Sequence, residues 1–140
     1  MIKVIDMQGI RYINLFERVT RIPTRYFFMY NESVVFCVPK DIVSKAIGKE
    51  GVNVKKLNQI VGKKIKVIAS PEGESKEAIQ KFLENAISPN RFNELNIEGS
   101  MVIVNAGSQN KAALIGRNKR RFLELQKIVA DYFGKDLKII

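Results

Sequence analysis

Apolar side chains in the first part of the chain follow a helical spacing and then a strand spacing. The i, i+3, i+4, i+7 positions of a helix with one buried face are occupied by Tyr12, Leu15, Phe16 and Val19. Two β-rich runs follow, residues 25–30 and 33–38, with only two polar residues between them. So short a polar connection predicts a pair of antiparallel strands. Pro23 lies between the helix and the strands, where a helix is expected to end.

The same order of elements occurs a second time further along the chain. The helical spacing is met again by Ile79, Phe82, Leu83 and Ala86. Residues 91–97 and 101–105 then predict another pair of strands, and Pro89 stands between helix and strands as Pro23 does in the first half.

A ten-residue segment follows each strand pair and repeats at a spacing of 68 residues. It reads IVSKAIGKEG at 42–51 and NKAALIGRNK at 110–119. The aligned positions include Ile47 with Ile115, Gly48 with Gly116 and Lys49 with Arg117. In both halves the pattern predicts a short helix, a glycine turn, a longer helix and a closing strand. The closing runs 62–68 and 134–140 are displaced by four further residues, about one extra helical turn.

The sequence therefore predicts an α+β fold that is built twice. Each copy is helix, strand, strand, helix, helix, strand, with a three-stranded sheet packed against helices. The turn-rich stretch 70–73 marks the joint, which gives two domains at residues 1–70 and 71–140.

Charge is the next informative feature, because the 140 residues carry 24 Lys or Arg, 14 Asp or Glu and no His, a net charge of +10. Residues 40–66 contain eight lysines against Asp41 and Glu50, and residues 111–127 contain six Lys or Arg against Glu124. The whole excess lies around the two glycine turns. A positive balance of this size points to an acidic partner, either nucleic acid or an anionic membrane surface.

Several classes of chemistry lack the residues that they need. Without His there is no imidazole base and no Cys/His zinc site, and the single Cys37 has apolar neighbours and is expected to be buried. The carboxylates Asp41, Glu50, Asp131 and Asp136 are scattered. We therefore expect no enzymatic activity, no cofactor and no metal site. No apolar run reaches membrane-spanning length and the N-terminus lacks a secretion pattern, so we expect a cytoplasmic protein without a membrane partner.

The glycine turn at 47–51 carries the strongest local chemistry. Gly48 and Gly51 let the backbone turn sharply and come close to a sugar-phosphate chain. The helix that follows offers free N–H groups and a positive dipole end to a phosphate. Four lysines lie in or near the turn, namely Lys45, Lys49, Lys55 and Lys56. A glycine turn that only joins two helices is the structural alternative.

In its context, this turn resembles the GxxG loop of the KH domain, which clamps about four nucleotides of single-stranded nucleic acid. Because the leading helix and the strand pair precede the motif, the similarity is to the type II KH arrangement. Two such units in tandem resemble the KH pair of the NusA family of transcription factors, in its archaeal form. The segment VPKDIVSKAIGKEGVNVKKL is closely similar to the first KH motif of that family, and the resemblance covers nearly the whole chain.

The resemblance implies roles for individual residues of the first unit. The backbone of Gly48, Lys49, Glu50 and Gly51 would track RNA phosphates, with Glu50 a solvated position in a basic loop. Ile47, Val43 and Val54 would line an apolar groove for bases, or alternatively pack the helices onto the sheet. The strand 65–69 would offer backbone groups to base edges.

The second turn departs from the motif, because it reads Gly116-Arg117-Asn118-Lys119 and lacks the final glycine. Asn tolerates a left-handed backbone and could partly restore the turn. The run Lys119, Arg120 and Arg121 adds three cations at the start of the next helix. We expect a copy that attracts phosphate by charge and grips nucleotides less specifically; a degenerate structural copy is the alternative.

The aromatic run 26–30 allows two interpretations. Exposed rings could stack bases, but the alternation along a strand sends Tyr26, Phe28 and Tyr30 to one face and Phe27 and Met29 to the other. Packing in a core or between domains is the expectation, because large aromatics are mostly buried.

The resemblance implies a monomeric protein that binds single-stranded RNA and acts in transcription termination or antitermination, holding nascent RNA across two KH domains. Candidate protein partners are RNA polymerase or other transcription factors. The alternative is a KH-type protein of ribosome assembly or RNA maturation.

Overall fold

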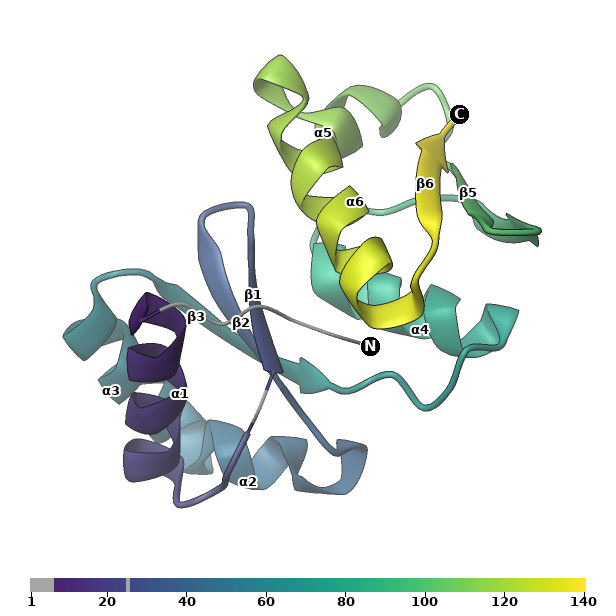
Figure 1. Ribbon diagram of the computed structural model, residues 1–140. Coiled ribbons are helices and arrows are strands. Elements are labelled where there is room, and N and C mark those ends of the chain that lie inside the picture. Colours follow the sequence, from purple (N-terminus) through teal and green to yellow (C-terminus); the bar gives the residue numbers. More distant parts are fainter. Residues whose placement is uncertain (1–6, 25) are drawn as a thin grey trace. The chain divides into compact units, whose positions relative to one another are not determined.

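The computed structural model describes residues 7–24 and 26–140, so the predicted strand residue Arg25 lies outside the described residues. The chain divides into two compact units. One ends at Ser70 and the other begins at Pro71 (Figure 1). Each has its own three-stranded sheet and its own helices.

The described part of the first unit contains three helices, three strands and two short 3-10 segments. In chain order they are α1 Met7–Thr20, β1 Tyr26–Tyr30, β2 Ser33–Val38, the 3-10 segment Lys40–Ile42, α2 Val43–Ile47, the 3-10 segment Lys49–Gly51, α3 Val52–Val61 and β3 Lys64–Ala69. β1 pairs antiparallel with β2, and β3 joins β2 in parallel, so that the sheet order is β1-β2-β3.

The helices of this unit lie on one side of its sheet, as Figure 1 shows. Alternation along β2 sends Val34, Phe36 and Val38 into a core that also contains Phe16 of α1 and Leu57 of α3. The rings of Phe16 and Phe36 stack with their centroids 4.5 Å apart. This core fixes α2 and α3 on the sheet and thereby positions the glycine turn between them.

The second unit repeats the order of elements. Its elements are α4 Lys76–Ile87, β4 Glu94–Glu98, β5 Met101–Asn105, α5 Lys111–Ile115, the 3-10 segment Arg117–Lys119, α6 Arg120–Phe133 and β6 Asp136–Ile139. β4 pairs antiparallel with β5, and β6 joins β5 in parallel. α4 and α6 meet through aromatic contacts, with the ring centroids of Phe82 and Tyr132 5.0 Å apart.

The α+β class and the length difference between the repeats agree with the sequence prediction. α6 has 14 residues and α3 has 10, which accounts for the one extra helical turn. The predicted strand at 91–97 begins too early, because β4 starts only at Glu94. A turn after α4, in which the N–H of Asn90 donates to the carbonyl of Ile87 at 2.9 Å, leaves Arg91 and Phe92 outside the strand.

The aromatic strand β1 contributes to packing on both of its faces. The ring of Phe27 lies edge-on to that of Tyr12 with centroids 5.7 Å apart. On the opposite face Phe28 and Tyr30 are only 7% and 3% exposed. The packing interpretation is confirmed for these residues. Cys37 is buried, as expected.

None of the helices formed by residues 7–24 and 26–140 has the length and apolar character of a membrane-spanning segment.

Candidate nucleic-acid interface

The turn between α2 and α3 has an unusual backbone that glycine makes possible. Gly48, Glu50 and Gly51 have φ values of +84°, +54° and +73°. The N–H of Gly51 donates to the carbonyl of Gly48 at 3.0 Å, and the N–H of Gly48 donates to Ser44 at 3.0 Å. Gly51 is the N-cap of α3 and has no side chain to accept from the first-turn N–H groups. The N–H of Val52 donates to the carbonyl of Lys49, and the first-turn amides beyond it can face an anion.

The two glycines of this turn have different surroundings. A Cβ on Gly48 would lie 2.9 Å from Cγ1 of Val52 and 3.0 Å from Nδ2 of Asn53, so that one of these side chains must shift to admit a methyl group. A Cβ on Gly51 would meet nothing within 4 Å. Gly48 is needed for close packing as well as for its φ, and Gly51 is needed only for its left-handed backbone.

Asn53, which the sequence reasoning did not single out, holds this turn together. Its Nδ2 donates to the carbonyl of Ala46 at 3.1 Å, which ties the last turn of α2 to the first turn of α3. The bond satisfies a carbonyl at a helix C-terminus that would otherwise lack an intrahelical partner.

The second turn keeps the same backbone without its final glycine. Gly116, Asn118 and Lys119 have φ values of +76°, +55° and +59°, which match the first turn position by position. The N–H of Lys119 donates to the carbonyl of Gly116 at 3.2 Å. Lys119 stands where the first turn has Gly51, so a lysine, and not only Asn118, adopts the left-handed conformation. That conformation costs a side-chain-bearing residue about 1 kcal/mol.

Arg121 is a structural counterpart of Asn53, 68 residues later in the chain. Its Nη1 donates to the carbonyl of Ala113 at 2.6 Å and joins α5 to α6. The side chain is half-buried, and its Cγ lies 3.0 Å from the place where a Cβ on Gly116 would stand. The sequence grouped Arg121 with the RNA-facing cations, but part of its guanidinium is engaged within the protein.

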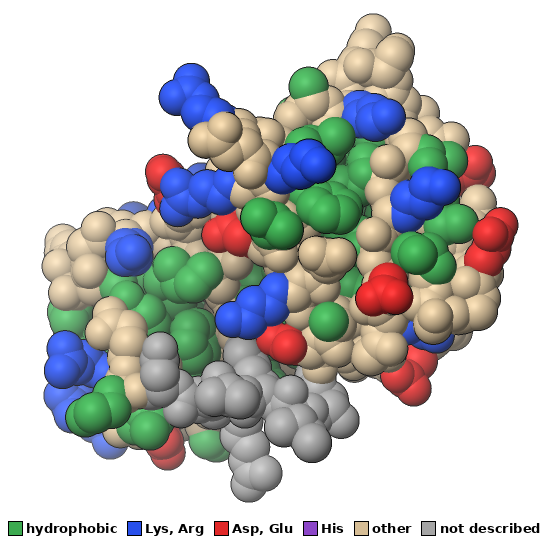
Figure 2. All heavy atoms as spheres, turned by 45° about the horizontal axis from the view of Figure 1, so that its top comes forward, with side chains coloured by type: hydrophobic (Ala, Val, Ile, Leu, Met, Phe, Trp, Pro, Cys, Tyr) green, Lys and Arg blue, Asp and Glu red, His purple; other side chains and the backbone are tan. Residues whose placement is uncertain are grey.

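The other predicted cations lie at the surface. The exposed ones are Lys45, Lys49, Lys55, Lys56, Arg117, Lys119 and Arg120. Glu50 and Asn118 are exposed as well. Figure 2 shows Lys and Arg side chains on a face that also carries hydrophobic side chains. Each turn is therefore a backbone cradle with solvent-exposed positive charge beside it.

The predicted groove residues of the first unit are half-buried. Val43, Ile47 and Val54 pack against the core and keep part of their surface exposed. This arrangement agrees with both of the alternatives, helix packing and an apolar groove wall. In the second unit the 68-residue spacing places Ile115 and Phe122 at the positions of Ile47 and Val54, and both are half-buried too. The spacing could have identified these two residues from the sequence.

Lys66 lies on β3, the strand that follows α3. Burial lowers the pKa of Lys66 below its ordinary value, and the nearby positive charge of Lys64 lowers it further. Its charge is thus less well solvated than that of the exposed lysines around the turn. Within residues 7–24 and 26–140, no group of three or more His, Cys, Asp or Glu side chains is placed to hold a metal ion.

A solved structure supports the fold. The structure named "Crystal structure of APE1850" superposes with a TM-score of 0.67 at 20% identity, covering 97% of this chain and 100% of that chain. At this identity the likeness concerns the fold alone.

Sequence comparison finds relatives whose names state a function. No protein-family model matches the chain. A protein of Methanocaldococcus jannaschii called "Probable transcription termination protein NusA" is 31% identical over 83 residues, which are 59% of this chain and 43% of that protein. A protein of Methanococcus vannielii with the same name is 26% identical over 141 residues, 97% of this chain and 79% of that protein. The chain thus matches less than half of the first relative's length. In sequence, the chain is therefore similar to archaeal proteins that carry the name NusA.

Proposed function

We propose that this chain is a single-stranded RNA-binding protein of transcription, made of two tandem KH domains of the type II arrangement at residues 1–70 and 71–140. The repeated order of helices and strands supports the KH assignment, because each unit places its glycine turn between two helices that pack on a mixed sheet. RNA polymerase or other transcription factors are the expected protein partners.

The observation that carries the proposal is the pair of matched turns. Both present a left-handed backbone at the start of a helix, and both have exposed cations beside them. Backbone N–H groups at a helix N-terminus and Lys or Arg side chains are the two main donors to phosphate oxygens. Two phosphate cradles on one chain fit a polyanionic strand better than a single small anion.

Binding in this proposal needs no chemical step. Exposed lysines release counterions from the phosphates, and the turn at 48–51 fixes the RNA backbone. Bases then reach the half-buried apolar side chains Val43, Ile47 and Val54. Lys45, Lys55 and Lys56 supplement the charge of Lys49 on the two adjoining helices.

The role in transcription rests on the names of the two relatives, both called probable transcription termination proteins. A cell extract tests it. We expect RNA polymerase to co-purify with the tagged chain and cross-linked RNA to be nascent transcripts. Co-purification of ribosomal subunits with cross-linked ribosomal RNA precursors would instead place the protein in ribosome assembly or RNA maturation.

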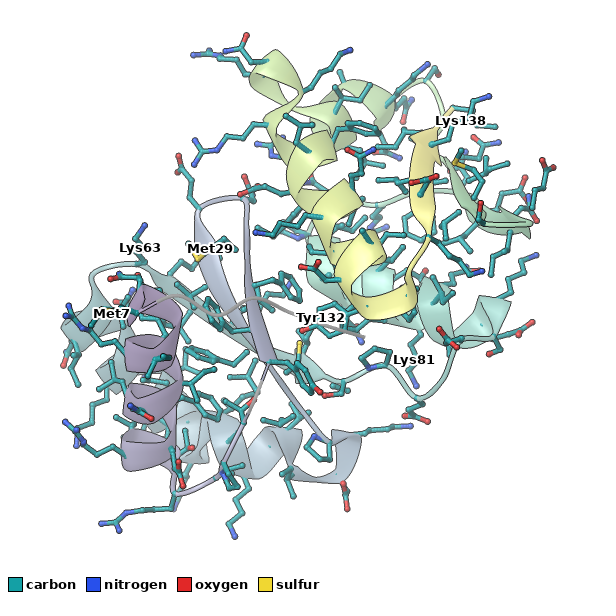
Figure 3. All side chains as sticks on the ribbon, in the orientation of Figure 1. Met7, Met29, Lys63, Lys81, Tyr132 and Lys138 are labelled. Atoms are coloured by element: carbon teal, nitrogen blue, oxygen red, sulfur yellow. The ribbon has the colours of Figure 1, made fainter. Side chains whose placement is uncertain are left out.

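Lys49→Asp tests the clamp, because it inverts the charge at position 49 of the first turn and keeps both glycines. The control is Lys63→Asp, an equal change of charge at an exposed lysine beyond the other end of α3, about 15 Å along the helix axis (Figure 3). Binding of a fluorescent single-stranded RNA is measured by anisotropy over a range of salt concentrations.

We expect Lys49→Asp to weaken binding about tenfold and to reduce the slope of log K against log salt by about 0.7, the loss of one phosphate contact. Lys63→Asp should bind within about twofold of the unaltered protein. Equal effects of the two substitutions would show that charge in general, and not this turn, holds the RNA.

A further inference from the structure

One aromatic side chain of the second unit stands apart from the others. Residues 71–140 contain five aromatics, and Phe82, Phe92, Tyr132 and Phe133 are buried, whereas Phe122 is only half-buried. The aromatic ring contacts found within residues 7–24 and 26–140 do not involve Phe122. Phe122 therefore has ring surface available that core packing does not use.

Phe122 lies next to the second glycine turn. It is the third residue of α6, so it is within about 5 Å along the helix axis of the turn that ends at Lys119. Arg117, Lys119 and Arg120 beside it are exposed. A phosphate bound at this turn would have its own sugar and base within reach of the ring.

The first unit shows what this position requires for packing alone. Val54 occupies the matching place on α3 and packs, half-buried, against the core with three side-chain carbon atoms, where a phenylalanine has seven. Phe122 is not fully buried either, so part of its larger, flat apolar side chain lies at the surface beside the turn.

The charge beside this position also differs between the units. The exposed Lys55 and Lys56 of α3 correspond to Leu123 and Glu124 of α6, and Leu123 is 55% exposed. The positive charge of the second unit is thus concentrated before Phe122, at Arg117, Lys119 and Arg120, and the residue directly after Phe122 is apolar and exposed. A phosphate held by those cations would leave its base beside an apolar surface.

We propose that Phe122 is a base-stacking residue: the turn at 116–119 holds a phosphate of single-stranded RNA, and a neighbouring base stacks on the ring of Phe122. This inference rests on the RNA-binding function proposed above. Stacking on an aromatic ring tolerates any base, because every base has a π-face. The second unit is then a stacking site of low sequence preference, and the first an aliphatic groove with a phosphate clamp.

Phe122→Leu tests the stacking, because leucine keeps an apolar side chain and removes the aromatic face. The matched control is Phe92→Leu, the same change at a buried ring of the same unit. Binding is measured with a single-stranded RNA and with a series of the same RNA in which one nucleotide at a time lacks its base. Thermal unfolding of each variant is recorded alongside.

We expect Phe122→Leu to weaken RNA binding about 5- to 20-fold and Phe92→Leu to change it less than about twofold while lowering the melting temperature. Removing the base at one position of the RNA should weaken binding to the unaltered protein. The same RNA should bind the Phe122→Leu variant no more weakly than the complete RNA does. Equal affinities for Phe122→Leu and the unaltered protein, or an unchanged profile along the base-free series, would overturn the stacking role.

A measurement on the unaltered protein covers the case in which Phe122→Leu does not fold. Ultraviolet cross-linking to a uridine-rich RNA followed by trypsin should label the peptide 122–127, which is released by cleavage after Arg121 and Lys127. Cross-links confined to peptides of residues 1–70 would overturn the proposal.

The failure of the stacking role can be distinguished from the failure of the proposed function. If Lys49→Asp weakens RNA binding and Phe122→Leu does not, the stacking role is wrong and the RNA-binding function stands. If no single-stranded RNA binds, the proposed function fails with it.

Discussion

The two glycines of the first turn provide a sharp test of how the turn is stabilised. Gly48→Ala and Gly51→Ala add one methyl group to the same loop, three residues apart. Gly48 has φ +84° and ψ +164°, a region occupied almost only by glycine, and a Cβ there would lie 2.9 to 3.1 Å from atoms of Val52 and Asn53. Gly51 has an ordinary left-handed backbone and open space around a Cβ.

The magnitudes follow from these surroundings. The backbone conformation at Gly48 makes alanine less favourable than glycine by about 2 kcal/mol in the folded state. Displacing the Asn53 amide from the carbonyl of Ala46 costs about 1 kcal/mol more. Alanine offsets about 0.7 kcal/mol of this loss of stability, because it lowers the conformational entropy of the unfolded chain. We expect Gly48→Ala to destabilise the first unit by about 2 to 3 kcal/mol, and Gly51→Ala by about 0.5 to 1 kcal/mol because only the left-handed strain remains.

Urea unfolding followed by circular dichroism, together with amide hydrogen exchange of α2 and α3, measures both variants. Exchange is needed because a chain with two units need not unfold in one step. Gly51→Lys, which copies the residue of the second turn, should behave like Gly51→Ala. Losses of equal size at positions 48 and 51 would refute the reasoning, since they would show that the space around the Cβ is irrelevant.

Two further substitutions test the second turn and the sheet. Arg121→Ala should lower the stability of the second unit by about 1 to 2 kcal/mol and reduce hydrogen-exchange protection in α5, because the bond to Ala113 is lost; unchanged protection would contradict this. Lys66→Met should stabilise the protein at pH 7, because burial lowers the pKa of Lys66 and makes its charged form unfavourable in the folded state. The unfolded chain binds that proton more tightly, so the advantage of methionine should shrink as the pH rises towards the ordinary lysine pKa of about 10.4, and a pH-independent difference in urea midpoints would contradict it.

The repeat made most of the fold predictable. The helical and strand spacings are local signals, and glycine at positions 48 and 116 marks turns that few other residues can form. A short-range pattern does not show where pairing with a neighbouring strand begins. The predicted strand at 91–97 therefore started too early, since the turn at Ile87–Asn90 delays β4 to Glu94.

The candidate site was predictable as a position and less so in its details. Both turns and their cations can be read from the spacing of 68 residues. Arg121 looks like any other cation in the sequence, and only the fold brings it to the carbonyl of Ala113. The sequence also offered Asn118 as the residue that rescues the second turn, whereas the lysine after it adopts the left-handed backbone too.

The sequence by itself determined the order of the elements, the repeat, the two turns and the concentration of positive charge around them. These features depend on periodicity and residue type, which act over a few positions. The tertiary structure decided which glycine has close neighbours, which cation is engaged inside the protein and which aromatic ring is left only half-buried. Those properties depend on contacts between segments distant in the chain, and a Cβ or a guanidinium has no neighbours until the helices pack.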